Sequence, residues 1–299
     1  MTTAVEANTA LETYQVLLFY KYITIAEPGI LANRMKELAE KYSLIGRVLV
    51  AEEGVNATLE GTIGDTEDFI KEFMIDERFA AMHIKRSVGN GTSFPKLSVK
   101  VRNQIVGTGF SKEDADPRVK TVAYLSPDEL RQWYEEERDF TVIDMRNDYE
   151  FASGHFKNAI EPGIRASREL PDAMPKLENY KHKKVVTVCT GGIRCESMAA
   201  YLLSKGFTDV HQLDGGIHTY MEKYPGKDFL GTLYTFDQRL TMDFGGDREV
   251  IGVCHLCDGT TEQYADCAYD PCHYHFLACA ACRDANGRAY CSETCKRMQ

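Results

Sequence analysis

The sequence of 299 residues has no apolar run of the length that a membrane span requires. The apolar stretch nearest its beginning is VLLFY, residues 16–20, whereas a transmembrane helix needs about 18 or more consecutive apolar residues. No export signal is recognisable, so we expect a cytoplasmic protein with no membrane partner. With 43% hydrophobic residues, the chain can bury more than one core, and its length favours more than one domain.

Positive charge is also scarce, since 35 lysines and arginines stand against 45 aspartates and glutamates. The formal net charge of -10 argues against a protein that coats nucleic acid without specificity, but it permits one local basic groove. Residues 83–102 contain no acidic residue and are the candidate. Their basic members are Lys85, Arg86, Lys96, Lys100 and Arg102. An ordinary charged strand face is an equal alternative.

Cysteine is nearly missing from the first 250 residues, where only Cys189 and Cys195 occur. The other eight cysteines are concentrated near the end, which points to metal binding rather than disulfides in a chain without an export signal. They form four closely spaced pairs: Cys254 and Cys257, Cys267 and Cys272, Cys279 and Cys282, and Cys291 and Cys295. Eight thiolates are enough for up to two tetrahedral zinc sites.

The four cysteine pairs can be assigned to two metal ions in two ways. Either successive pairs bind together, or the first and third pairs share one ion and the second and fourth share the other; we favour the interleaved arrangement. His255, His273 and His275 lie among the cysteines, so a histidine could replace one thiolate. Thiols without any metal are the alternative. A segment this short can hardly build a core alone, so we expect its folding to depend on the metal.

The first hundred residues alternate between strand and helix patterns. Strands are predicted in YQVLLFYKYI and on both sides of the glycine turn in GRVLVAEEGVNATLEG, and helices in PGILANRMKELAEKYSL and TEDFIKEFMIDERFA. The second helix is expected to start after Asp65 and Thr66 as caps. Strands in HIKRSVG and PKLSVKVRN follow, which gives the order βαββαβ of a ferredoxin-like (acylphosphatase-like) α+β domain, placed at residues 1–115.

A linker around residues 116–124 leads to a second alternating segment. SPDELRQWYEEE predicts a helix that begins with proline, and FTVIDMR and VVTVC predict buried strands. Such alternation implies a parallel sheet, whose loops at the carboxyl ends of the strands form the natural active site. We therefore predict an α/β domain over residues 116–230 and a Cys-rich segment over residues 231–299.

The segment VVTVCTGGIRCES carries the main catalytic candidate, because Cys189 stands at the end of a predicted strand. The loop residues that follow it are Thr190, Gly191, Gly192 and Ile193. We expect a helix from about Glu196, so that loop N–H groups and the positive end of the helix stabilise a thiolate. Arg194 adds positive charge, which favours an exposed nucleophile with a depressed pKa. The alternative is a small buried cysteine.

Three segments resemble the signatures of a single rhodanese domain: VIDMRNDYEFASGHFKNAI, VVTVCTGGIRCES and VHQLDGGIHTY. In that family the cysteine after the strand carries a persulfide, and the matching residue is Cys189. The resemblance gives mostly structural roles to Asp144, Arg146, Gly154, His155, Gly215 and Gly216. Related phosphatases place five residues between cysteine and arginine, but only four separate Cys189 from Arg194, which favours sulfur over phosphate. Cys195 is either a resolving thiol or a helix residue packed inward.

The whole chain resembles the bacterial rhodanese-type tRNA uridine 5-hydroxylases, through GRVLVAEEGVNATLEG, CTGGIRCE and the Cys-rich tail. The resemblance implies formation of 5-hydroxyuridine at the wobble position of tRNA, with molecular oxygen as co-substrate, the anticodon region as partner and Cys189 required. Ser197 stands where that family commonly has lysine, a departure that we do not expect to change the chemistry. No flavin or nicotinamide motif is present in the sequence, so the group that activates oxygen is unassigned.

Two other functions stay open. One is a sulfurtransferase that passes sulfane sulfur from a Cys189 persulfide to an acceptor thiol, with a sulfur donor or reductant as partner. The other is a zinc-stabilised tRNA-binding or redox-sensing scaffold. The sequence leaves the oligomeric state open.

Overall fold

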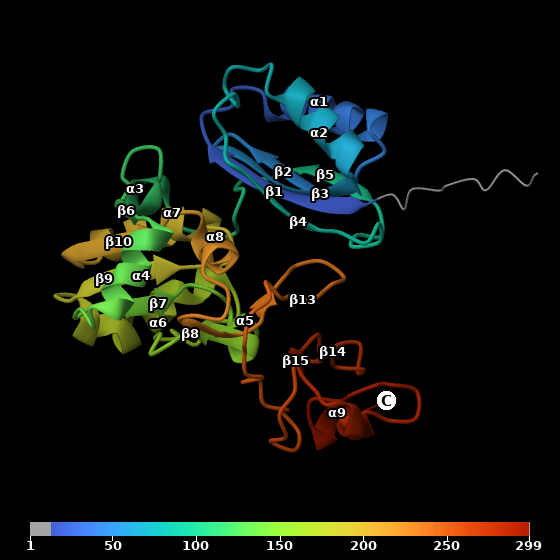
Figure 1. Ribbon diagram of the computed structural model, residues 1–299, viewed down its shortest axis with the longest axis vertical. Coiled ribbons are helices and arrows are strands. Elements are labelled where there is room, and N and C mark those ends of the chain that lie inside the picture. The colour runs from blue at the N-terminus through green and yellow to red at the C-terminus, as the bar shows by residue number, and fades with distance from the viewer. Residues whose placement is uncertain (1–12, 299) are drawn as a thin grey trace, which may run out of the picture. The chain divides into compact units, whose positions relative to one another are not determined.

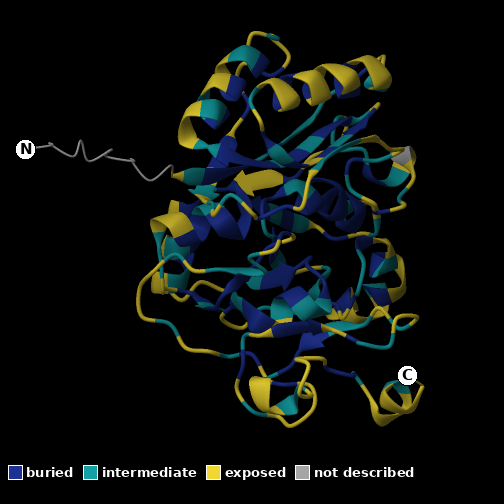
Figure 2. Cartoon of the chain, turned by 90° about the vertical axis from the view of Figure 1, so that its right-hand side faces the viewer, coloured by how far each residue is buried: buried dark blue, intermediate teal, exposed yellow. Residues whose placement is uncertain are grey.

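The structure is a computed structural model that describes residues 13–298 (Figure 1). The chain divides between Ile105 and Val106 into two compact units, and each unit has a hydrophobic core of its own. In both units the strands are largely buried, while the outward sides of the helices are exposed (Figure 2). Among the described residues, no helix combines the length and apolar character that crossing a membrane would require.

The first unit is a five-stranded sheet with two helices on one face (Figure 1). Its elements are β1 (Tyr14–Tyr22), α1 (Pro28–Lys41), β2 (Ile45–Ala51), β3 (Gly54–Thr62), α2 (Ile63–Phe73), β4 (Ile84–Val88) and β5 (Leu97–Val101). The strand order is β4-β1-β3-β2-β5, with β5 parallel to β2 and the other neighbours antiparallel. The predicted acylphosphatase-like fold is confirmed, and β5 extends it at one edge.

Helix α2 begins earlier than the sequence predicted. Thr62 ends β3 in an extended conformation, and its hydroxyl oxygen accepts a hydrogen bond from the Asp65 backbone N–H at 3.1 Å. Thr62 is therefore the cap, and the prediction of Asp65 and Thr66 in this role is wrong. Thr66 lies inside the first turn, where its buried hydroxyl oxygen accepts a hydrogen bond from Gln15. The next residues of the helix, including Phe69 and Phe73, pack into the core of this unit.

The second unit is built on a four-stranded parallel sheet of order β6-β10-β9-β7. Its elements before the tail are α3 (Lys112–Ala115), β6 (Ala123–Leu125), α4 (Pro127–Glu135), β7 (Thr141–Asp144), α5 (Asp148–Ser153), β8 (Gly154–Phe156), η1 (Ser167–Glu169), α6 (Leu170–Leu177), η2 (Glu178–Tyr180), β9 (Lys184–Val188), α7 (Ile193–Ser204), β10 (Asp209–Leu213), α8 (Gly216–Lys223) and β11 (Phe229–Gly231). The predicted helix after Ser126 is confirmed, and a capping box between Ser126 and Glu129 starts it. The predicted linker is partly wrong, because β6 begins within it.

The Cys-rich tail belongs to the same compact unit as the parallel sheet. It contains two short ribbons, β12 (Leu233–Tyr234) with β13 (Thr241–Met242) and β14 (Tyr264–Asp266) with β15 (His275–Leu277), followed by η3 (Ala280–Cys282) and α9 (Glu293–Arg297). The hydroxyl of Tyr264 donates a hydrogen bond to the backbone carbonyl of Tyr149 in α5 at 2.6 Å. Aromatic packing of Tyr234 against Tyr149 supports the same junction. The tail is thus docked onto α5.

Candidate functional site

Cys189 lies at the carboxyl end of β9, in the position that the parallel sheet makes available for chemistry. Gly192 adopts a left-handed conformation with φ of 96° and caps α7, which begins at Ile193. The prediction of a helix from Glu196 is therefore wrong by three residues. A left-handed glycine turns the chain sharply, so the loop is shorter than predicted. Arg194 and Cys195 consequently lie in the first helical turn rather than before it.

Helix α8 supports the Cys189 loop with its first backbone groups. The N–H groups of Ile217 and His218 donate hydrogen bonds of 3.0 Å to the carbonyls of Cys189 and Thr190, respectively. A Cβ atom added to Gly216 would lie 2.6 Å from the Cys189 carbonyl oxygen and 2.6 Å from the Gly192 nitrogen. Glycine is thus required at position 216, where the start of α8 meets the backbone of the Cys189 loop. The sequence interpretation of this turn as structural agrees with the contact.

Arg194 forms a buried, two-pronged ion pair with Glu150 of α5. The guanidinium nitrogens lie 2.5 Å and 2.8 Å from the two carboxylate oxygens. The Thr190 hydroxyl accepts a further hydrogen bond of 3.2 Å from Arg194. Phe236 of the tail lies over the guanidinium, with 5.5 Å between Cζ and the ring centroid. Arg194 is therefore fixed in place, and its charge acts on its neighbours from a constant position.

Sequence reasoning missed Glu150. The spacing of Asn147 and Glu150 is the signature of a capping box, and a carboxylate oxygen of Glu150 does accept a hydrogen bond from the Asn147 N–H at 2.9 Å. The capping-box spacing can be read from the sequence. The pairing with Arg194 cannot be read from it, because 44 residues separate the two partners.

A second buried ion pair holds α5 in position. Arg146 and Asp144 are fully buried and pair at 2.7 Å, and Arg146 also donates hydrogen bonds to the carbonyls of Gly154 and Glu150. These contacts tie both ends of α5 to the end of β7. The arrangement is that of a scaffold, as the resemblance implied, because neither side chain has a surface open to a substrate.

The electrostatic surroundings of Cys189 favour its thiolate. Burial raises the pKa of Cys189, but a hydrogen bond from the Cys195 thiol, the charge of Arg194 and the backbone N–H groups of both residues lower it overall to about 6. Burial and the neighbouring Cys189 raise the pKa of Cys195 well above its ordinary value. At neutral pH the pair is therefore a thiolate with a thiol donor beside it.

Cys189 is nevertheless fully buried, so the prediction of an exposed nucleophile is wrong for this conformation. Its side chain belongs to a hydrophobic cluster with Cys195 and Met198 of α7 and Ile143 of β7. The reason is the early start of α7, which places the first helical turn against the end of the central strand. The sulfur therefore has no exposed surface in this conformation.

The predicted basic groove is not assembled. Strands β4 and β5 form opposite edges of the first sheet, about 19 Å apart for four strand spacings. Lys85 is buried with its amine 5.5 Å from the Tyr20 ring centroid, and Arg86 pairs with Glu67 at 2.8 Å. The prediction of a single groove of five cations is therefore wrong, because β5 leaves β4 to pair with β2. The cations exposed at the β5 edge are Lys96, Lys100 and Arg102.

The eight tail cysteines form two groups of four. One group is Cys254, Cys257, Cys279 and Cys282, and the other is Cys267, Cys272, Cys291 and Cys295. This grouping is the interleaved one. Within each group the sulfur atoms lie within 4.8 Å of one another.

The spacing of the sulfur atoms suits a tetrahedral metal ion. Zinc with Zn–S bonds of about 2.3 Å needs sulfurs about 3.8 Å apart. The sulfur of Cys257 lies 3.6 Å from that of Cys279, and the sulfur of Cys291 lies 3.6 Å from those of Cys272 and Cys295. These separations are close to the required value, so the donor sets fit the ion.

Histidine belongs to neither group among the described residues. The ring of His255 contacts the Cys291 carbonyl through Nε2, and that of His275 contacts the Asp266 carboxylate through Nδ1. Backbone N–H groups of Cys279 and Cys291 point to the sulfurs of Cys254 and Cys267 at 3.3 Å and 3.5 Å. Such donors orient thiolates for a metal ion. The two four-cysteine groups of the tail could therefore bind metal ions.

Comparison with known families divides the chain into three matching regions. Residues 14–105 match the UPF0176 acylphosphatase-like domain, residues 126–223 match the rhodanese-like domain, and residues 230–296 match the rhodanese C-terminal domain. A solved rhodanese-like domain protein from Staphylococcus aureus is 29% identical, covers 33% of this chain and 91% of its own, and has a TM-score of 0.29.

Curated relatives match nearly the whole chain. The tRNA uridine(34) hydroxylase of Staphylococcus carnosus is 42% identical over 288 residues, which are 95% of this chain and 89% of the relative. The tRNA uridine(34) hydroxylase of Staphylococcus haemolyticus is 43% identical over 269 residues, or 88% and 83% of the two chains. Identity at this level over almost the full length shows that the chain belongs to the tRNA uridine(34) hydroxylase family of rhodanese-domain enzymes.

Proposed function

We propose that this protein hydroxylates uridine 34, the wobble base of tRNA, to 5-hydroxyuridine with molecular oxygen. The observation that carries the proposal is the identity of 42% over 95% of the chain with a relative of that name. The buried Cys189 thiolate supplies the nucleophile that the chemistry needs. The substrate places the protein in the cytoplasm, with the anticodon region of tRNA as its partner.

Each residue around the loop has a distinct role in this proposal. Cys189 is the catalytic residue that meets the base. The Cys195 thiol donates a hydrogen bond to the Cys189 sulfur, and Arg194 acts through its charge because Glu150 binds its two terminal nitrogens. One atom of oxygen enters the base and the other leaves as water, so a reductant must supply two electrons and two protons. That reductant is a further partner.

The two cysteine groups hold zinc in this proposal, one ion in each. Because four thiolates complete a tetrahedral shell, both ions are structural and leave no position for a substrate. Zinc supplies cross-links that a tail with small apolar clusters otherwise lacks.

The exposed cations at the β5 edge are proposed to contact the tRNA backbone. Lys96, Lys100 and Arg102 are exposed, and no acidic residue lies between them in the sequence. Lys85 and Arg86 are left out of this set because one is buried and the other is paired. Removal of any one of these cations should lower the salt dependence of tRNA binding by roughly 0.7 to 0.9 in slope.

The function is tested in a host strain that lacks its own tRNA uridine hydroxylase. Expression of the wild-type chain should restore 5-hydroxyuridine in digested tRNA, measured by mass spectrometry, and ¹⁸O₂ should label it. Cys189→Ser should abolish the product, whereas Cys195→Ser should keep part of it because a hydroxyl is still a donor. Unmodified tRNA together with thiosulfate-to-cyanide turnover would instead identify a sulfurtransferase. RNA binding without any modification by the wild type would identify a scaffold.

A further inference from the structure

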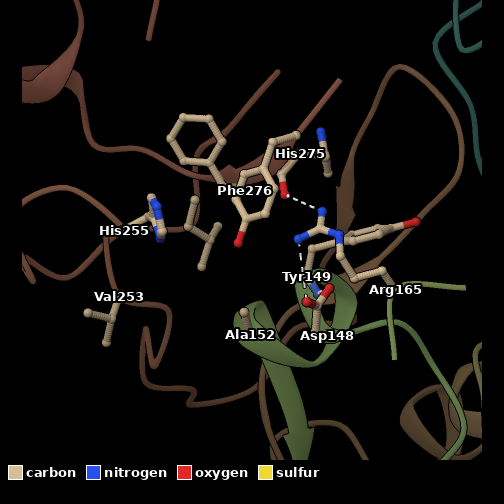
Figure 3. Close-up of a pocket in the computed structure, with 10 residues that line it drawn as sticks. Asp148, Tyr149, Ala152, Arg165, Val253, His255, His275 and Phe276 are labelled. Atoms are coloured by element: carbon tan, nitrogen blue, oxygen red, sulfur yellow. Dashed lines mark hydrogen bonds and ion pairs between the residues drawn. The ribbon is translucent and has the colours of Figure 1, made fainter. Parts of the chain in front are cut away.

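A pocket of about 220 Å³ lies at the junction between α5 and the tail (Figure 3). Its lining residues are Asp148, Tyr149, Ala152, Arg165, Val253, His255, Tyr274, His275, Phe276 and Leu277. Five of these ten side chains carry an aromatic or imidazole ring, and one is a guanidinium. The volume is below the roughly 300–1,000 Å³ of sites for drug-sized ligands, so the pocket suits a group of the size of one nucleobase.

Arg165 is the cation of this pocket, and its polar contacts are long. The guanidinium lies 3.4 Å from the Asp148 carboxylate and 3.3 Å from the His275 carbonyl, the two contacts that are dashed in Figure 3. Its Cζ lies over the Tyr274 ring, 3.9 Å from the centroid. The ring holds the guanidinium in place while its five N–H donors are only partly used. Such a group is suited to bind a phosphate.

Helix α5 connects the pocket with the Cys189 loop. Tyr149 and Asp148 face the pocket, whereas the neighbouring Glu150 binds Arg194 in the first turn of α7. Consecutive helical residues rise by about 1.5 Å, so the pocket and the Cys189 loop are contacted from the same turn of α5. Both sites belong to the second compact unit.

We propose that this pocket binds a nucleotide of the anticodon loop that neighbours the target uridine. The base stacks on the ring of Tyr149, and its phosphate contacts Arg165. Single-stranded RNA is commonly held in this way, by aromatic side chains on splayed bases and by cations on phosphates. The carboxylate of Asp148 accepts hydrogen bonds from the base edge. This inference rests on the proposed function, because it takes tRNA to be the substrate.

The test uses the full-length protein and an RNA anticodon stem–loop whose binding is measured against salt. Arg165→Gln should weaken binding and reduce the salt slope by roughly 0.7. Ala152→Trp should fill the pocket from an exposed position of α5 and weaken binding roughly 5- to 160-fold, the range expected for loss of one stacked base. Alkylation of Cys189 should keep its wild-type rate in both variants.

Lys183→Gln is the matched control. Lys183 is an exposed cation near a tyrosine ring, but it precedes β9 at the end of the sheet opposite to Cys189. This variant should bind RNA like the wild type. If the wild type modifies tRNA and all three variants bind the stem–loop equally, the pocket proposal is overturned while the proposed function stands. If the wild type forms no 5-hydroxyuridine in the complemented strain, the proposed function fails and the pocket proposal falls with it.

Discussion

Three kinds of neighbouring group lower the pKa of the Cys189 thiol. Together they outweigh burial, which raises it. A fully buried thiol ordinarily stays protonated, but the Cys195 thiol, the Arg194 charge and two backbone N–H groups reverse that tendency. The same contacts make Cys195 the poorer acid of the two. This difference supports the proposal that Cys189 is the nucleophile and Cys195 its hydrogen-bond donor. This division of roles gives Cys195 a function that does not require a disulfide.

The pH dependence of Cys189 alkylation should report this environment. Because the pKa of Cys189 is lowered to about 6, the thiolate is present above pH 6 and is lost as the pH falls through that value. The rate with iodoacetamide, followed by peptide mass spectrometry, should rise with a midpoint near pH 6 and then level off. Cys195→Ala should move the midpoint upward, and Cys195→Ser should move it less. A wild-type midpoint near that of a free cysteine would contradict the assignment.

Gly216→Ala should damage the loop more than an equivalent change elsewhere. Its Cβ would press on the carbonyl of Cys189 and the nitrogen of Gly192, both at 2.6 Å. Gly206→Ala is the control, because Gly206 has a positive φ of 94° but no atom within 4 Å of the added Cβ. Backbone strain should cost each variant about 1–2 kcal/mol in urea unfolding, and Gly216→Ala should lose more because of its two close contacts. Only Gly216→Ala should raise the midpoint of Cys189 alkylation; equal midpoints would count against loop support by α8.

At the level of elements, α5 joins three parts of the second unit although it is only six residues long. Arg146 anchors it to β7, Glu150 reaches α7, and Tyr149 contacts the tail. The helix has no strong periodic pattern of its own, so its importance comes from these tertiary contacts. Loss of one of these three contacts should therefore affect the loop and the tail together.

The Glu150–Arg194 pair should show strong coupling in a double-mutant cycle. Removal of one partner leaves a buried charge without compensation, so Glu150→Gln or Arg194→Gln should each cost about 3–5 kcal/mol in the free energy of unfolding. The double variant should cost clearly less than the sum. The exposed pair Lys71–Asp68 is the control and should contribute less than about 1 kcal/mol. Additive costs for the buried pair would show that the two charges do not depend on each other.

The sequence predicted much of this arrangement, for reasons that are local. The alternating strands and helices and the proline-started helix after Ser126 follow from periodicity and turn chemistry. The starts of α2 and α7 were misplaced because a strand residue, Thr62, and a glycine took over the capping. The partners of Arg194 and the separation of β4 from β5 depend on contacts between distant segments, which a pattern along the chain does not record.

At the level of the whole molecule, aromatic contacts attach the tail to the α/β part, and the two cysteine groups bring distant loops of the tail together. The apolar cluster around the second group contains only small or aromatic residues, such as Ala278 and Phe276. Such a cluster is too small to hold the loops of the tail without cross-links. Metal ions should therefore decide whether the tail is ordered, while the sheets depend on cores of their own.

Metal removal should consequently have a local effect. The purified protein should contain close to two equivalents of zinc by elemental analysis, one for each group of four cysteines. Chelation should increase hydrogen exchange from about residue 250 onward, whereas β9 and the first sheet should stay protected. Zinc below half an equivalent, or uniform loss of protection along the chain, would contradict this arrangement.

The interleaving of the cysteine pairs also constrains how the tail is made. The first group is complete only when Cys282 has been synthesised, and by then the chain already contains Cys267 and Cys272, two ligands of the second group. The two closed loops therefore overlap, and closing the first shortens the span that the second must close. In the proposed zinc-bound form, loading of one ion would therefore prepare the site of the other. A chain that ends before Cys291 would contain the complete first group but only two of the four ligands of the second group. A cell's proteases could recognise such an incomplete tail.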